Sequence, residues 1–127
     1  MLPVCFNTDS LFAVLKKQDD AQRDALPFGV IGFDAEGIVR IYNVIESRLT
    51  GLSRATVVGS DLFKVVAPCM NNFMVAQRLE DTVSSNLPLD AVIDYVLTFR
   101  MRPTQVQLRM MSEPGAPLRF LAIQRRI

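Results

Sequence analysis

Apolar and polar residues alternate over the last third of the chain, with the period of two that is typical of β-strands. Over residues 91–101 every second side chain is apolar or aromatic, and the same alternation recurs over residues 106–110. The apolar-rich segment from Leu118 to Ile127 is interpreted as the last strand. Three strands are therefore expected. Turn-forming residues between these segments predict turns at Arg102-Pro103 and at Glu113-Pro114-Gly115.

Two shorter apolar runs lie earlier in the chain, from Phe28 to Phe33 and from Ile38 to Tyr42. The intervening Asp34-Ala35-Glu36-Gly37 is rich in turn formers, so the two runs are predicted to pair as a hairpin. Short helices that end at glycines 51 and 59 should follow. Two strands, a helical stretch and three more strands predict an α+β fold, with a five-stranded antiparallel sheet flanked by helices.

The longest predicted helix spans residues 71–85 and ends at Asn86-Leu87-Pro88. Its apolar residues recur at helical spacing, so they are expected to face the core. They are Phe73, Ala76, Leu79 and Val83.

Residues 1–26 are predicted to form a separate N-terminal helical cap, and residues 27–127 the core of the same single domain. One helix is expected after Thr8-Asp9-Ser10 and a second after Asp19-Asp20. From these residues alone, a plain amphipathic extension remains an equal alternative to a functional cap.

The chain has 127 residues, of which 50% are hydrophobic and 21% charged, which is enough for one sizeable core. Its longest apolar runs are too short to cross a bilayer, and no signal-peptide pattern opens it. Two distant cysteines without a CxxC motif agree with a reducing compartment, so a cytoplasmic protein without a membrane partner is expected. The absence of histidine excludes Ser–His and Cys–His hydrolases and histidine metal sites.

Six arginines and one acidic residue follow position 99. The formal net charge of the chain is only +1, which argues against a nucleic-acid partner. The arginines fall on strand positions without an aromatic platform between them. A solvated sheet face is therefore favoured over a nucleic-acid surface, with a partner-binding face as the remaining alternative.

The two cysteines differ in their surroundings. Pro68 pushes the residue before it out of the helical region, and a helical pattern begins near Met70. Cys69 is therefore expected near a helix N-terminus, where N–H groups favour a thiolate that can attack an activated acyl group. The alternative is a small buried hydrophobic residue, which is the commoner role of a lone cysteine. Cys5 is expected to be a minor packing residue.

Tyr42, Glu46 and Thr50 are spaced by four residues. If a helix begins after Asn43, which is a good cap, their side chains lie on one face and form a polar cluster among apolar neighbours. The alternative is an exposed helix face with a solvated glutamate.

These residues carry a resemblance to the photoactive yellow protein family, whose members are blue-light receptors with a PAS fold. The resemblance runs nearly end to end, with a short deletion after Cys69 and a compensating insertion before Asp90. The combination of YN, E, TG and APC at this spacing is specific, although each piece alone is weak. The matching segments are KQDD at 17–20, FG at 28–29, YN at 42–43, Glu46, TG at 50–51, VVG at 57–59, FK at 63–64, VAPC at 66–69, DY…F.M at 94–101 and PT at 103–104.

The resemblance implies that Cys69 carries p-coumaric acid as a thioester, with the backbone N–H of Cys69 on the thioester carbonyl. It implies that Tyr42 and Glu46 donate hydrogen bonds to the phenolate of this chromophore, that Thr50 supports Tyr42, and that Met101 assists recovery after light. It further implies a cap that loosens on illumination and an unknown downstream signalling protein. Residues that would complete the pocket are Leu52, Phe63, Ala67, Pro68, Leu97, Arg100 and Met101.

A phenol ordinarily has a pKa near 10, so a phenolate at neutral pH needs short, charge-assisted hydrogen bonds. Glu46 is then expected to be protonated, because a second buried anion would be costly. Transfer of its proton after isomerisation would leave a buried carboxylate and loosen a peripheral segment. One departure matters: the family has an arginine after TG, where this chain has Leu52, and Arg54 or Arg100 are the candidate substitutes.

Three function classes are compatible with these features. A blue-light photoreceptor that is not an enzyme is the leading interpretation. A light-insensitive PAS sensor or interaction module, with Cys69 free, is the alternative. A cysteine acyltransferase is the third class, and the missing histidine base argues against it.

Overall fold

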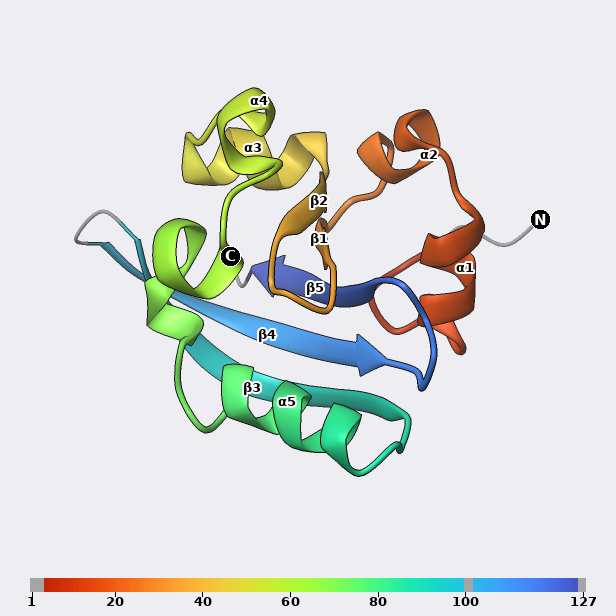
Figure 1. Cartoon of the computed structure of the whole chain (residues 1–127). Helices are drawn as coiled ribbons and strands as arrows, with labels where there is room; N and C mark the ends of the chain where they lie inside the picture. The colour runs from red at the N-terminus through yellow and green to blue at the C-terminus, as the bar shows by residue number, and fades with distance from the viewer. Residues whose placement is uncertain (1–3, 100–101, 126–127) are drawn as a thin grey trace.

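The computed structural model describes residues 4–99 and 102–125. Its centre is an antiparallel five-stranded sheet with the strand order β2-β1-β5-β4-β3, shown in Figure 1. This arrangement confirms the predicted α+β fold. The strands are β1 (Gly29–Phe33), β2 (Val39–Tyr42), β3 (Leu89–Phe99), β4 (Arg102–Ser112) and β5 (Arg119–Arg125).

The predicted hairpin is confirmed, because Ile31 of β1 pairs with Tyr42 of β2. The turn predicted at Arg102-Pro103 is wrong, because both residues belong to β4, where Pro103 pairs with Thr98. Proline is tolerated there because β5 pairs with β4 only from Val106 onward, so the missing N–H of Pro103 interrupts no ladder with β5.

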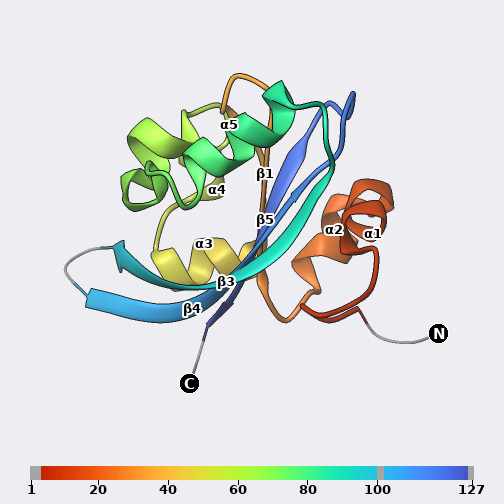
Figure 2. The same cartoon turned by 90° about the horizontal axis from the view of Figure 1, so that it is seen from below.

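The helices divide between the two faces of the sheet, as Figure 2 shows. The first two cover one face, and the others lie on the opposite face with the segment that carries Cys69. The helices are α1 (Leu11–Lys17), α2 (Asp20–Asp24), α3 (Val44–Thr50), α4 (Arg54–Val57), the π-helical turn η1 (Leu62–Val66), the 3-10 turn η2 (Pro68–Met70) and α5 (Ala76–Ser84). None of the helices within the described residues is long and apolar enough to span a membrane.

The N-terminal segment packs on the sheet as a cap. Asp19 begins α2 with a reciprocal capping box to Gln22, as its sequence predicts. Leu11, Phe12 and Leu15 of α1 are buried in one cluster with Phe120 of β5 and other residues of that sheet face. This cluster is separate from the core on the opposite face, so the sheet has a hydrophobic core on each side.

The long helix predicted over residues 71–85 is wrong in its start, and of its predicted core residues only Leu79 is buried. The helix α5 begins at Ala76, because the side chain of Asn72 accepts the N–H groups of Met74 and Val75 and forms a turn instead. Phe73 is 79% exposed and Val83 51% exposed, so neither faces the core. Val75 and Leu79 are the residues that this region buries.

The described side chains among the arginines after position 99, which are those of Arg109, Arg119 and Arg125, do not form a solvated face, which corrects that prediction. Arg109 and Arg119 are buried. The guanidinium of Arg109 pairs with Asp90 and donates to two backbone carbonyls of the cap, and that of Arg119 donates to the carbonyls of Asp34 and Ala35. These arginines join distant segments of the chain.

Candidate functional site

The helix α3 is fixed to the sheet by its cap. The side chain of Asn43 accepts the N–H of Glu46 and that of Val30 in β1, and it donates to the carbonyls of Arg23 and Phe28. The predicted cap is therefore confirmed, and it also joins α3, β1 and α2. Gly51 ends the helix with φ +75°, a conformation that glycine adopts without strain.

Glu46 and Thr50 are buried on α3, and Tyr42 is buried at the end of β2 with its hydroxyl against Thr50, so the predicted polar cluster exists and the exposed alternative is wrong. The hydroxyls of Tyr42 and Thr50 lie 2.7 Å apart. Because the hydroxyl of Thr50 donates its single hydrogen to the carbonyl of Glu46, Tyr42 donates to Thr50 in this arrangement.

The phenol of Tyr42 is kept neutral. Its burial, followed by the nearby charge of Glu46, raises the pKa of Tyr42 to about 12, and the hydrogen bond to Thr50 only partly opposes this. Tyr42 therefore retains its proton at neutral pH and stays a hydrogen-bond donor.

The carboxyl group of Glu46 has no solvent exposure and is paired with Arg125 of β5. Nη1 of Arg125 lies 2.7 Å from Oε1 of Glu46, and Nη2 lies 3.1 Å from Oε2. This two-pronged geometry is that of a carboxylate, because both oxygens accept. The expectation of a protonated Glu46 applies to a site with a phenolate beside it, and it stays a prediction.

Gly29 provides the space for this pair. A Cβ atom at Gly29 would lie 2.0 Å from Oε1 of Glu46, so only a glycine allows the carboxylate to lie against β1. Sequence reasoning missed the contributions of Gly29 and Arg125 to this site. Gly29 belongs to the FG segment of the family resemblance, and Arg125 is one of the six arginines after position 99. Neither observation indicated that these residues contact Glu46.

Cys69 does not lie at the start of a long helix, which corrects the predicted setting. It is the middle residue of η2, and α5 begins seven residues later. Its thiol is free and half-buried, and the residue packs against the core cluster that contains Tyr42. The carbonyl of Cys69 accepts hydrogen bonds from Tyr95 of β3 and from Asn72, which sequence reasoning also missed.

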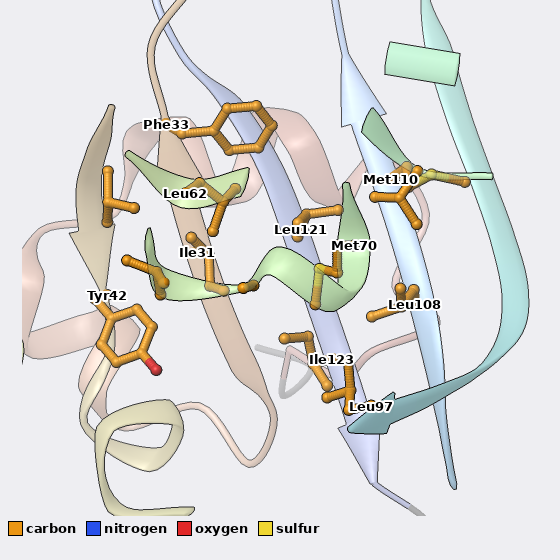
Figure 3. Packing of buried hydrophobic residues seen from close by; sticks show 14 of the residues in the cluster. Ile31, Phe33, Tyr42, Leu62, Met70, Leu97, Leu108, Met110, Leu121 and Ile123 are labelled. Atoms are coloured by element: carbon orange, nitrogen blue, oxygen red, sulfur yellow. The ribbon is translucent and has the colours of Figure 1, made fainter. Parts of the chain in front are cut away.

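Figure 3 shows the buried cluster beneath η1 and η2, with Tyr42 at one margin and Met70 near the middle. Of the residues expected to complete the pocket, Ala67 and Leu97 are buried in this cluster, and Leu52 and Phe63 are partly buried against it. Pro68 is exposed. Arg100 and Met101 lie outside the described residues.

Two further expectations are corrected. Arg54 does not substitute for the missing arginine, because its guanidinium is paired with Asp24 of α2 at 2.6 Å. Cys5 is an exposed residue and not a packing residue. Hydrogen bonds from Thr8 and from the backbone of Asn7 lower the pKa of its thiol.

The chain matches no family model over its length. It is 36% identical over 105 residues to photoactive yellow protein from Rhodothalassium salexigens, a match that covers 83% of each chain. Its fold superimposes with a TM-score of 0.80 on the photoactive yellow protein domain of the sensor histidine kinase Ppr from Rhodospirillum centenum. That pair is 37% identical, and the match covers 88% of this chain and 97% of the other.

A PAS domain of the quorum-sensing receptor RpfR from Cronobacter turicensis has the same fold, with a TM-score of 0.61 at 12% identity. This match covers 79% of the present chain and 94% of the other. At this identity the likeness concerns the fold alone, and it identifies the fold as that of PAS domains.

Proposed function

This chain belongs to the photoactive yellow protein family, and on that premise we propose that it is a blue-light photoreceptor that carries p-coumaric acid as a thioester on Cys69. The observation that supports the proposal most is the placement of a free, half-buried thiol against the cluster that contains Tyr42. Family relatives imply a chromophore, and the identity of that chromophore is part of the proposal.

The donor groups of the site suit a ligand with one phenolic end. The hydroxyls of Tyr42 and Thr50 and the carboxyl group of Glu46 are buried together, while most of the surrounding side chains are apolar. A bound p-coumaric thioester would supply a double bond that isomerises on absorbing light. Cys69 would supply the sulfur, and Tyr95 and Asn72 would keep the backbone of Cys69 in place.

Tyr42 and Glu46 would hold the phenolate oxygen. For Tyr42 to donate to a ligand, the hydrogen of Thr50 must turn from the carbonyl of Glu46 to the oxygen of Tyr42, which a hydroxyl rotation achieves. For Glu46 to donate, its carboxylate must first take up a proton. Glu46 would later release this proton in the light reaction, and the charge that remains would loosen the cap formed by residues 1–26.

The cap would be the part of the single domain that changes, and the core of residues 27–127 would hold the chromophore. A downstream signalling protein would read the change. The related domain from Rhodospirillum centenum belongs to a sensor histidine kinase, and this supports the proposal of a signalling partner for this chain.

The test combines an absorption spectrum with the intact mass, before and after addition of activated p-coumaric acid. The expected result is a mass gain of one adduct with a visible band that bleaches under blue light. Cys69→Ala should abolish both, whereas the matched control Cys5→Ala should leave both unchanged, because Cys5 is exposed and lies on the cap. An adduct that survives in Cys69→Ala would contradict the thioester assignment.

The remaining outcomes separate the alternatives. An adduct that absorbs only in the near ultraviolet would mean that the site binds a protonated phenol. If wild-type protein forms no adduct, the light-insensitive PAS module becomes the better assignment.

A further inference from the structure

The salt bridge between Glu46 and Arg125 joins three elements. Glu46 comes from α3, Arg125 from the end of β5, and the carboxylate lies on Gly29 of β1 between them. The side chain of Glu46 is 0% exposed and that of Arg125 only 16% exposed. In a pair so far removed from water, each charge depends on the other, because a buried charge without its partner would be costly.

The charges around Tyr42 sum to zero in this arrangement. Tyr42 is neutral, Glu46 carries one negative charge and Arg125 carries one positive charge. An additional buried anion would upset this balance unless a proton or a cation compensates for it. Leu52 supplies no charge at the position where the family resemblance predicts an arginine, and Arg54 is already paired with Asp24.

We propose that Arg125 is a positioning residue that sets the charge state of this site. In the chromophore-free protein it holds Glu46 as a carboxylate. When a phenol occupies the site, Glu46 takes up the proton of that phenol and becomes a hydrogen-bond donor. Arg125 then remains as the counter-charge of the phenolate, so the net charge of the buried site stays at zero.

The second half of this proposal rests on the proposed function, because it needs a phenolic ligand beside Tyr42. The first half does not, since it concerns the chromophore-free protein alone. The two halves therefore have separate measurements.

The first measurement is the infrared difference spectrum between wild-type protein and Glu46→Gln, both without chromophore and at neutral pH. The expected spectrum shows the loss of carboxylate bands in the variant and no protonated-carboxyl C=O band in the wild type. A protonated-carboxyl band that disappears in Glu46→Gln would overturn the proposal, and this test needs no change at Arg125. The difference spectrum between Arg125→Met and the double variant Arg125→Met with Glu46→Gln should show the C=O band of a protonated Glu46.

The second measurement titrates the visible band of chromophore-loaded protein. Arg125→Met should lower the ratio of phenolate to phenol at fixed pH by about tenfold or more, which moves the midpoint by about one pH unit. Arg125→Lys keeps the charge and should restore most of the ratio. Arg48→Met is the matched control, because it removes the same charge from an exposed position on α3.

Failures of the two proposals are distinguishable. If wild-type protein loads but Arg125→Met titrates as wild type does, the role of Arg125 is wrong and the proposed photoreceptor stands. If wild-type protein forms no adduct, the proposed function fails and the infrared comparison still decides the charge state of Glu46. If Arg125→Met does not fold, the conclusion rests on Arg125→Lys. A tenfold lower ratio of phenolate to phenol in that variant would show that the bidentate geometry is required in addition to the charge.

Discussion

The two faces of the sheet each carry an arginine, buried or largely buried, that pairs with a carboxylate, but the two pairs differ in what surrounds them. On the face covered by the cap, Arg109 pairs with Asp90, whose side chain is 45% exposed. On the opposite face, Arg125 pairs with Glu46, whose side chain is 0% exposed. The guanidinium of Arg109 also donates at 2.8 Å to the carbonyls of Phe6 and Thr8.

The pair of Arg109 and Asp90 therefore has a structural role, whereas the pair of Arg125 and Glu46 places two opposite charges inside the protein. The bonds of Arg109 to backbone carbonyls attach the chain before α1 to β4, and Asp90 can be hydrated if the pair breaks. Glu46 has no such access to water, and its pair lies beside the phenol of Tyr42. A change in the charge of that pair would destabilise the folded protein, and a signalling site requires such a coupling between a local change and the fold.

The largest effect is expected for Arg125→Met. Removal of the guanidinium leaves the fully buried Glu46 without its partner, so the carboxyl group must take up a proton, and loss of the pair should lower the free energy of unfolding by about 3–5 kcal/mol. The double variant Arg125→Met with Glu46→Gln should recover most of this loss, because the neutral amide of glutamine needs no counter-charge. Denaturant unfolding of the four proteins measures both values. A loss below about 1 kcal/mol in the single variant would show that water reaches Glu46.

Arg109→Met should cost less, at most about 3 kcal/mol, because the half-exposed Asp90 can turn to solvent. Its characteristic result should be local: limited proteolysis should cut within the N-terminal cap faster than in wild type, while the core of residues 27–127 stays resistant. Arg109→Lys is the control that keeps one charge. Equal resistance of the cap in Arg109→Met and wild type would show that the apolar contacts of α1 hold the cap without the guanidinium of Arg109.

Alkaline pH should destabilise the protein through Tyr42. Its pKa is raised from 10 in the unfolded chain to about 12 in the folded protein, so the native state binds this proton more tightly. The resulting stability is fully present below pH 10 and is lost as the pH rises from 10 to 12, by about 3 kcal/mol. The difference in unfolding free energy between wild type and Tyr42→Phe should change across that interval. A constant difference would mean that Tyr42 titrates normally.

The smallest effect is expected for Thr50→Val, which removes the acceptor of the Tyr42 hydroxyl. A buried donor without its partner should lower the free energy of unfolding by about 1–2 kcal/mol. Thr50→Ser keeps the hydroxyl and should behave as wild type does in thermal unfolding. An unchanged stability of Thr50→Val would show that the Tyr42 hydroxyl finds another acceptor.

Elements that depend on neighbouring residues could be predicted from the amino-acid sequence. The period of two over residues 91–99, the glycine at position 51 and the cap at Asn43 predicted a strand, a helix end and a helix start that the structure confirms. The spacing of Tyr42, Glu46 and Thr50 predicted their common face. Such signals are local because each arises from hydrogen bonds and dihedral preferences within a few residues.

Contacts between residues far apart in the chain could not be predicted and became visible in the folded protein. Glu46 and Arg125 are separated by 79 positions and meet because β5 lies beside β1 in the sheet. The same holds for Asn72 and Tyr95, which are 23 positions apart. Glu46 was expected to be protonated because a phenolate would lie beside it, and the sequence did not indicate that the sheet order places Arg125 opposite its carboxyl group. Strand order brings that arginine and that carboxylate together, and no local pattern in the chain encodes it.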